Sequence, residues 1–124
     1  MDTVVCILVV EDDPDAQFVV GHMVERSKRA VVMTGSAQEA LRILTEHPET
    51  YRAVVIDLEL PGKDGWQLLR EIRETPALHG LACIAITAYH RMNLREEVLR
   101  AGFNAYFPKP IDAPSFAAEL DHLA

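Results

Sequence analysis

Short runs of apolar residues alternate along the chain with longer segments in which apolar positions recur at helical spacing. The runs are bounded by turn-forming or polar residues, which is typical of fully buried strands. We predict strands at residues 4–10, 30–35, 52–57, 81–87 and 103–107.

The segments between the runs carry the signals that begin and end helices. Asp13 is a favourable N-cap residue ahead of the first segment, and Ser36 with Glu39 after it forms a predicted capping box. Ile111 and Phe116 are spaced as a hydrophobic staple around the start of the last segment. We predict helices at about residues 14–28, 37–47, 65–75, 91–101 and 113–123.

Continuous apolar strands that alternate with helices predict a parallel sheet covered by helices on both faces. The predicted fold class is therefore α/β, a doubly wound five-stranded sheet with five helices. At 124 residues the chain is long enough to bury a hydrophobic core, and no linker, repeat or low-complexity segment interrupts the pattern. We predict one domain over residues 1–124, and the initial Met and the clean ends favour a complete gene product.

Charge and composition narrow the class of protein. The formal net charge is −7 and the basic residues are scattered, which argues against a nucleic-acid or anionic-membrane surface. No apolar stretch approaches the ~20 residues of a membrane-spanning helix, and no signal peptide is recognisable. Cys6 and Cys83 lie in apolar runs, so we expect buried free thiols in a reducing cytoplasm. The histidines lack metal-ligand spacing and are predicted to be surface residues: His22, His47, His79, His90 and His122.

Reactive side chains follow the predicted strands at their carboxyl ends. In a parallel sheet these ends meet at one edge, which is where open α/β proteins place their chemistry. Asp57 closes an apolar run and is followed by a Pro-Gly turn. The other strands deliver carboxylates, a hydroxyl and an ammonium to the same edge: Glu11, Asp12, Asp13, Thr87 and Lys109.

Clustered carboxylates raise one another's pKa unless a cation joins them, and Mg²⁺ is a hard cation that suits such oxygen ligands. The ammonium of Lys109 and the hydroxyl of Thr87 suit the remaining oxygens of a phosphoryl group. Asp57 is central in the cluster and is placed to be the nucleophile that forms an aspartyl phosphate. The pattern predicts phosphoryl transfer to Asp57.

The segments ILVVEDDP (residues 7–14), DLELPGKDG (57–65), ITA (86–88) and KP (109–110) together resemble the receiver domain of two-component response regulators. The resemblance covers essentially the whole chain, in order. The length of the chain and the lack of an output module resemble the single-domain regulators, such as the chemotaxis regulator. This resemblance implies a flavodoxin-like fold with strand order 2-1-3-4-5.

The resemblance also implies roles for the acidic residues. Asp57 matches the phosphoacceptor, which receives a phosphoryl group from a phosphohistidine on a partner kinase. Glu11 and Asp12 match the acidic pair that holds Mg²⁺, with Asp12 bound directly and Glu11 through water. Asp57 itself and the backbone carbonyl of Glu59 complete the implied metal ligands, and Asp13 keeps its role as a helix cap.

Three further positions match residues that respond to phosphorylation in this family. Thr87 matches the hydroxyl that moves toward the phosphoryl group, and Lys109 matches the conserved ammonium, with a cis bond expected to Pro110. Tyr106 matches the aromatic switch that turns inward when Thr87 moves. Glu59 borders the phosphoryl group, where its carboxylate either repels a phosphodonor or orients an attacking water.

Four functions are open from the sequence. The first is a switch that displays a surface of the fourth helix, fifth strand and fifth helix to a downstream protein partner after a histidine kinase phosphorylates Asp57. The second is a phosphorelay intermediate that passes the group to a histidine phosphotransfer protein. A Mg²⁺-dependent phosphatase and a receiver fold that is never phosphorylated are disfavoured, so we expect a signalling domain and not an enzyme. The expected state is a monomer or a phosphorylation-dependent dimer.

Overall fold

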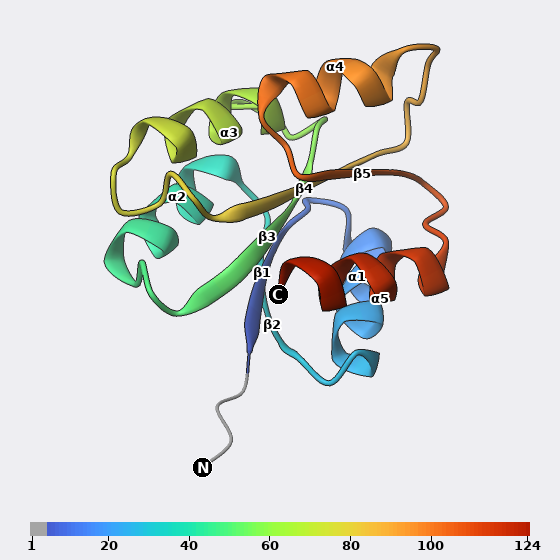
Figure 1. The fold of residues 1–124 in the computed structure, drawn as a ribbon, viewed down its shortest axis with the longest axis horizontal. Coiled ribbons are helices and arrows are strands. Elements are labelled where there is room, and N and C mark those ends of the chain that lie inside the picture. The colour runs from blue at the N-terminus through green and yellow to red at the C-terminus, as the bar shows by residue number, and fades with distance from the viewer. Residues whose placement is uncertain (1–4) are drawn as a thin grey trace.

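The computed structural model describes residues 5–124. Strands and helices alternate throughout this part of the chain, as predicted (Figure 1). The strands are β1 (Cys6–Val10), β2 (Ala30–Thr34), β3 (Tyr51–Asp57), β4 (Ala82–Thr87) and β5 (Ala105–Pro108). The helices are α1 (Pro14–Arg26), α2 (Ala37–Glu46), α3 (Gly65–Glu74), α4 (Leu94–Ala101) and α5 (Ala113–Leu123).

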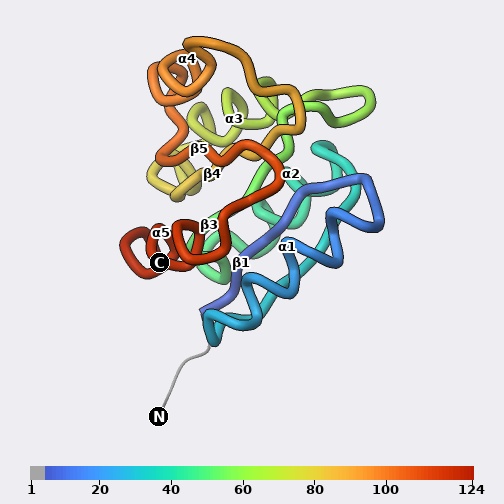
Figure 2. The backbone as a smooth tube through the Cα atoms, turned by 90° about the vertical axis from the view of Figure 1, so that its right-hand side faces the viewer, coloured from blue at the N-terminus to red at the C-terminus, as the bar shows by residue number. Residues whose placement is uncertain are grey.

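All strands pair in parallel in one sheet, in the order β2-β1-β3-β4-β5. The helices α1 and α5 cover one face, and α2, α3 and α4 cover the other (Figures 1 and 2). This confirms the doubly wound α/β fold and its predicted strand order. The connections reverse direction between β1 and β3, so the carboxyl ends of these two strands form the crevice in which such folds bind ligands.

Two hydrophobic cores follow from the alternation of side chains along the central strands. Leu8 of β1 and Val54 of β3 belong to the core under α2, α3 and α4, whereas their neighbours Ile7 and Val55 belong to the core under α1 and α5. All four side chains are fully buried. Because both faces are covered, the central strands are apolar through most of their length, and this is why the sequence shows continuous runs.

Polar side chains begin most of the helices at the predicted caps. Asp13, Asp64 and Asp112 each accept a hydrogen bond from a backbone N–H inside the helix that follows, at 2.9 to 3.0 Å. Ser36 accepts from the backbone N–H of Glu39 at 3.2 Å. The capping box is only half formed, since the Glu39 carboxylate accepts from the Thr34 hydroxyl at 2.8 Å instead.

Some element boundaries differ from the prediction. The helix α4 begins at Leu94 and not at residue 91, because Asn93 has a positive φ of 68° that interrupts the helix and its side chain makes no capping hydrogen bond. The strand β5 begins at Ala105, two residues later than expected. The first residue of the predicted first strand, Val4, lies outside the described residues.

Arg73, in the last turn of α3, ties this helix to the segments around it. Its Nη1 donates to the carbonyl oxygens of His79 at 2.9 Å and Leu81 at 2.6 Å, just before β4. Its Nη2 donates to the carbonyl of Gly102 at 2.8 Å and to the side chain of Asn104 at 3.0 Å, just after α4. The planar guanidinium thereby fixes the carboxyl end of α4 against α3.

The cysteines and the lengths of the helices were both subjects of predictions from the sequence. Cys6 and Cys83 are free thiols, although only Cys83 is buried and Cys6 is half-buried at the start of β1. Within residues 5–124, no helix has the length and apolar character needed to cross a membrane.

Candidate functional site

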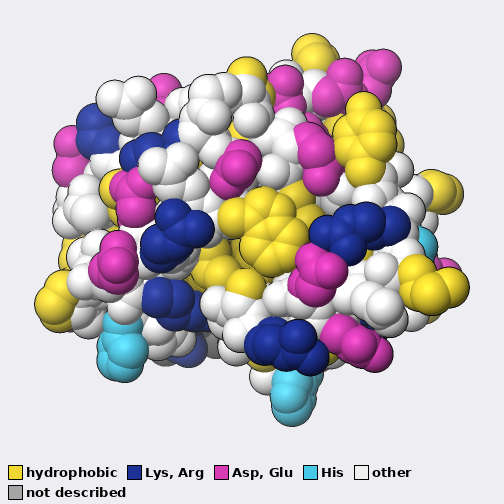
Figure 3. All heavy atoms as spheres, turned by 90° about the horizontal axis from the view of Figure 1, so that it is seen from above, with side chains coloured by type: hydrophobic (Ala, Val, Ile, Leu, Met, Phe, Trp, Pro, Cys, Tyr) yellow, Lys and Arg dark blue, Asp and Glu magenta, His cyan; other side chains and the backbone are white. Residues whose placement is uncertain are grey.

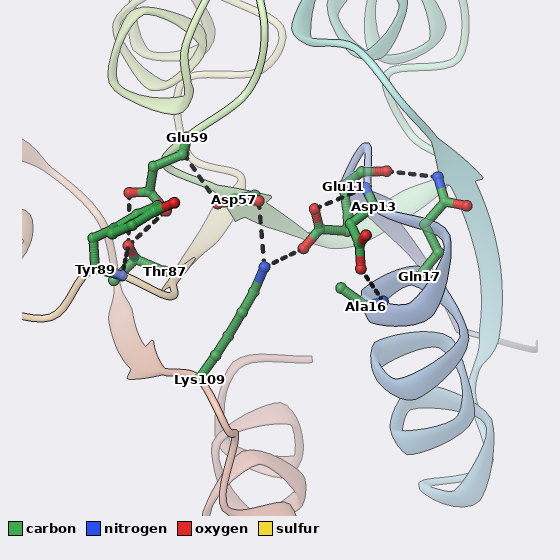
Figure 4. Close-up of polar contacts among 9 residues, drawn as sticks. All are labelled: Glu11, Asp13, Ala16, Gln17, Asp57, Glu59, Thr87, Tyr89 and Lys109. Carbon is green, nitrogen blue, oxygen red and sulfur yellow. Dashed lines mark hydrogen bonds and ion pairs between the residues drawn. The ribbon is translucent and has the colours of Figure 1, made fainter.

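The side chains predicted to be reactive meet at the carboxyl ends of the strands (Figure 4). Asp57 is the last residue of β3 and Thr87 the last of β4, while Glu11 follows β1 and Lys109 follows β5. Nζ of Lys109 lies 3.3 Å from Oδ2 of Asp57 and also forms an ion pair with Oε1 of Glu11. One ammonium thus joins carboxylates from two neighbouring strands.

Burial governs the electrostatics of this group. The exposed fraction of Glu11 is 0% and that of Asp57 is 4%, and buried carboxylates are costly unless they are paired. Burial raises the pKa of Glu11 to about 7, with Asp57 acting in the same direction and Lys109 against it. Burial lowers the pKa of the Lys109 ammonium, but the two carboxylates outweigh this effect and hold that pKa above its usual value. Lys109 therefore remains a cation.

The acidic residues could also share a divalent cation. Glu11, Asp12 and Asp57 each offer a carboxylate oxygen, and these oxygens lie within 4.8 Å of one another. Asp12 is exposed, so the group opens to solvent. Oδ1 of Asp57 accepts a hydrogen bond from the backbone N–H of Glu59 at 3.0 Å, which places the Glu59 peptide group beside the cluster. Hard carboxylate oxygens at an open site fit Mg²⁺, which keeps several of its waters.

The Glu59 side chain has a partner that the sequence did not reveal. The hydroxyl of Thr87 donates to the Glu59 carboxylate, whose oxygens lie 2.7 and 2.6 Å from Oγ1 (Figure 4). Oγ1 also accepts a hydrogen bond from the backbone N–H of Tyr89 at 3.0 Å. Burial raises the pKa of Glu59, while the bond from Thr87 lowers it and Asp57 raises it further. Neither predicted use of the Glu59 carboxylate included this contact.

Tyr106 is 1% exposed, so its ring is already inward while the Thr87 hydroxyl is bound to Glu59. The family resemblance implies that Tyr106 turns inward when Thr87 moves, but in this structure its burial does not require that movement.

The hydroxyl oxygen of Tyr106 lies 2.6 Å from Nδ1 of His90, and the guanidinium of Arg95 stands over its ring at 5.3 Å from the centroid. His90 is exposed, as predicted, but it also contacts the predicted switch residue, which sequence spacing could not indicate. The bond between Lys109 and Pro110 is cis, as expected.

An apolar groove lies beside the site, between α1 and the segment that leads into α5. It is lined mainly by aliphatic side chains together with Lys109: Asp15, Ala16, Val19, Val20, Met23, Lys109, Pro110 and Ile111. Phe18 and Val19 on the same helix are unusually exposed for apolar residues, at 76% and 47%. The groove therefore brings an open apolar face of α1 next to Lys109.

The fold and the site define a class of protein. A doubly wound sheet carries a partly buried acidic cluster, a lysine and a hydroxyl at the carboxyl ends of β1, β3, β4 and β5. The family model "response regulator receiver domain" matches residues 7–121. The chain therefore belongs to the response regulator receiver domains of two-component signalling.

Individual relatives agree with this assignment. The chain is 41% identical to an uncharacterised protein of Leptolyngbya boryana, over 86% of this chain and 79% of that protein. It is 27% identical to the polar-differentiation response regulator DivK of Brucella ovis, over 89% of this chain and 88% of DivK. It also matches the receiver domain of sensor histidine kinase PA1611 from Pseudomonas aeruginosa, with a TM-score of 0.84, 30% identity and 98% of each chain covered. That structure has a magnesium ion coordinated in its active-site cleft.

Proposed function

We propose that this protein is a phosphorylation-controlled response regulator whose Asp57 accepts a phosphoryl group from a histidine kinase. The observation that carries the proposal is the position of Asp57. Its carboxylate is 4% exposed, lies 3.3 Å from the Lys109 ammonium and shares an acidic cluster with Glu11 and Asp12. A buried carboxylate with a fixed cation on one side and a cation-binding group on the other is suited to a dianionic adduct.

In the proposed reaction a carboxylate oxygen of Asp57 attacks the phosphorus of a phosphohistidine. A new P–O bond forms while the P–N bond breaks, and the leaving imidazole keeps the electron pair of that bond. Lys109 stabilises the negative charge of the transferred group. Glu11, Asp12, Asp57 and the Glu59 carbonyl would hold Mg²⁺, which when bound supplies further charge neutralisation.

The proposed output is a change in the surface of α4, β5 and α5, which a downstream protein partner would recognise. Thr87 would turn its hydroxyl to the phosphoryl group, and Tyr106 would respond to that movement. The side of the molecule over α3 and α4 shows apolar side chains among both acidic and basic ones (Figure 3). Met92 and Leu99 are exposed at 84% and 43%, which suits a surface that binds protein rather than nucleic acid.

The apolar groove beside Lys109 favours a second candidate function, a phosphorelay intermediate. A histidine phosphotransfer protein docked on the exposed Phe18 and Val19 of α1 would bring its histidine close to Asp57. The phosphoryl group would then return to histidine, and no output surface would be required. The lifetime of the aspartyl phosphate separates the two candidates, because a relay must store the group until transfer.

We propose a signalling domain in the cytoplasm and not a turnover enzyme, and either a monomer or a phosphorylation-dependent dimer. A Mg²⁺-dependent phosphatase would need an acid/base carboxylate two residues after its nucleophile. Glu59 occupies that position, but its carboxylate accepts the Thr87 hydroxyl. The two free thiols agree with a reducing compartment.

The first experiment treats the protein with acetyl phosphate and Mg²⁺ and reads the intact mass. We expect one added phosphoryl group, absent in Asp57→Asn and absent when a chelator is present. Asp64→Asn is a matched control, because Asn also caps helices and α3 should be retained. An adduct that persists in Asp57→Asn contradicts the proposed acceptor. If wild type shows no adduct, Mg²⁺-dependent binding of beryllofluoride distinguishes a short-lived phosphate from a site that is never phosphorylated.

A further inference from the structure

The hydrogen bond between Thr87 and Glu59 joins two strand ends on the same side of the site. Thr87 is fully buried, whereas Glu59 belongs to the exposed residues of the loop after β3, with its carboxylate at a partly buried contact. The Thr87 hydroxyl lies within 2.7 Å of both carboxylate oxygens of Glu59. A bond from a hydroxyl to a carboxylate is charge-assisted and stronger than one between neutral groups.

The Thr87 hydroxyl has only one proton to donate. In this structure that proton is directed to Glu59, and the acceptor capacity of Oγ1 is used by the backbone N–H of Tyr89 at 3.0 Å. A phosphoryl group on Asp57 would need the same proton. Thr87 can therefore donate a hydrogen bond to the phosphoryl group only after its hydrogen bond to Glu59 is broken.

We propose that the Glu59 carboxylate is a latch that holds Thr87 in the unphosphorylated arrangement and thereby opposes the response to phosphorylation. The inference rests on the proposed function, because it requires a phosphoryl group at Asp57 that competes for Thr87. Glu59 is a positioning residue in this scheme, since it acts through Thr87. The strength of the hydrogen bond between Thr87 and Glu59 sets how readily the Thr87 hydroxyl moves to a phosphoryl group on Asp57.

Electrostatic repulsion by Glu59 would also oppose phosphorylation of Asp57, without any hydrogen bond to Thr87. The negative charge of Glu59 lies two residues from Asp57 and repels any anion bound there. Removal of the carboxylate therefore favours the phosphorylated state under both explanations. The two differ in their dependence on Thr87, because repulsion does not need the Thr87 hydroxyl whereas the latch does.

A double-mutant cycle separates the two explanations. Beryllofluoride, a phosphoryl mimic, is titrated with Mg²⁺ into wild type, Glu59→Ala, Thr87→Val and the double variant, and amide NMR spectra report binding. For the latch we expect Glu59→Ala to raise the affinity about tenfold in the wild-type background, the size of one modest hydrogen bond to a charged group. In the Thr87→Val background we expect the same change to have almost no effect.

Further variants complete the test. Glu59→Gln keeps an acceptor for the Thr87 hydroxyl but removes the charge, so it should lie between wild type and Glu59→Ala. Thr87→Ala also removes the hydroxyl, so it takes the place of Thr87→Val if that variant does not fold. Thr87→Ser keeps the hydroxyl and should retain the full effect of Glu59→Ala. Glu96→Ala removes an exposed carboxylate on α4 and controls for net charge.

The titrations distinguish failure of the latch from failure of the proposed function. An equal effect of Glu59→Ala in both Thr87 backgrounds, or no effect in the wild-type background, overturns the latch. In either case a normal response of the wild-type protein leaves the proposed function intact. A wild-type protein that shows no Mg²⁺-dependent response to beryllofluoride and no adduct with acetyl phosphate overturns the proposed function, and the latch with it.

Discussion

The hydroxyl oxygen of Tyr106 lies 2.6 Å from Nδ1 of His90, so the inward position of the tyrosine is supported by a residue of the loop before α4. Arg95, in α4 itself, stands over the same ring. The tyrosine of β5 is therefore linked to the loop through a polar contact and to the helix through its aromatic face. Movement of either segment must alter the environment of Tyr106.

Replacing His90 with Ala should loosen Tyr106. We expect the ring signals of Tyr106 in NMR spectra to shift and broaden, and the free energy of unfolding to fall by about 1 kcal/mol or less, as for one partly exposed hydrogen bond. His79→Ala is the matched control, since that side chain is exposed at a distance from Tyr106 in sequence and on another loop. Unchanged Tyr106 signals in His90→Ala would contradict a supporting role.

Mg²⁺ should stabilise the fold through Asp12. At a concentration one hundred times the dissociation constant, we expect the metal to raise the free energy of unfolding by about 2.7 kcal/mol. Asp12→Asn should lose most of this gain while its metal-free stability stays within about 0.5 kcal/mol of wild type, because Asp12 is exposed. Urea unfolding with and without Mg²⁺ measures both quantities.

The neighbouring carboxylate supplies the control for that experiment. Asp13 caps α1 through the backbone N–H of Ala16, and Asn is an equally good cap. Asp13→Asn should therefore keep both the fold and the full gain from Mg²⁺. Equal losses of the gain in the two variants would show that general negative charge, and not coordination by Asp12, attracts the metal.

Gly65 should not tolerate a side chain. A Cβ atom at this position would lie 2.4 Å from the carbonyl oxygen of Asp57 and 2.9 Å from Cα of Leu58. Gly65→Ala should lower the free energy of unfolding by about 2 kcal/mol, since rigid backbone on both sides must shift. It should also displace the amide NMR signals around Asp57. At Gly80 a Cβ meets nothing within 4 Å, so Gly80→Ala should leave stability nearly unchanged.

The buried thiol of Cys83 should make stability fall at alkaline pH. Burial raises its pKa to about 11 from 9.0, although Arg73 acts in the opposite direction. The folded state therefore keeps a proton that the unfolded chain loses. The stabilising contribution is complete below pH 9 and is lost as the pH rises toward 11.

A Cys83→Ala variant isolates this contribution. Its free energy of unfolding should fall less steeply than that of wild type between pH 9 and pH 11, by up to about 1.4 kcal/mol per pH unit. The slope is the diagnostic quantity, because loss of the sulfur also lowers stability at every pH. Cys6→Ala should change the slope less, since Cys6 is half-buried. Parallel curves for wild type and Cys83→Ala would disprove the assignment.

The fold and the meeting of the site residues were predictable for a common physical reason. Strands buried on both faces must be apolar throughout, and parallel strands must end at the same edge. The order of apolar runs therefore identified the sheet, and the polar residues at the ends of four of the five runs identified the site. Asp57, Thr87 and Lys109 needed no knowledge of side-chain conformation to be placed together.

Contacts that depend on side-chain direction were not predictable. Glu59 and Thr87 lie 28 positions apart, and only the packing of adjacent strand ends brings the hydroxyl to the carboxylate. Glu39 had the spacing of a capping box, but its carboxylate accepts a hydrogen bond from the Thr34 hydroxyl instead. The late start of α4 depends on one backbone angle at Asn93, where Asn tolerates a left-handed conformation that the hydrophobic pattern does not reveal.

The two ends of α4 are held by different kinds of contact. Arg73 anchors the carboxyl end through the Gly102 carbonyl, whereas the amino end starts at an Asn93 whose side chain makes no capping bond. An ion pair of 2.7 Å between Arg91 and Glu97 joins the first turns of α4 to the loop before the helix. Arg95 lies in the first turn of α4 and contacts the Tyr106 ring, so a rearrangement of Tyr106 must be accommodated at the amino end of the helix. The carboxyl end is expected to stay beside α3, because Arg73 holds the Gly102 carbonyl.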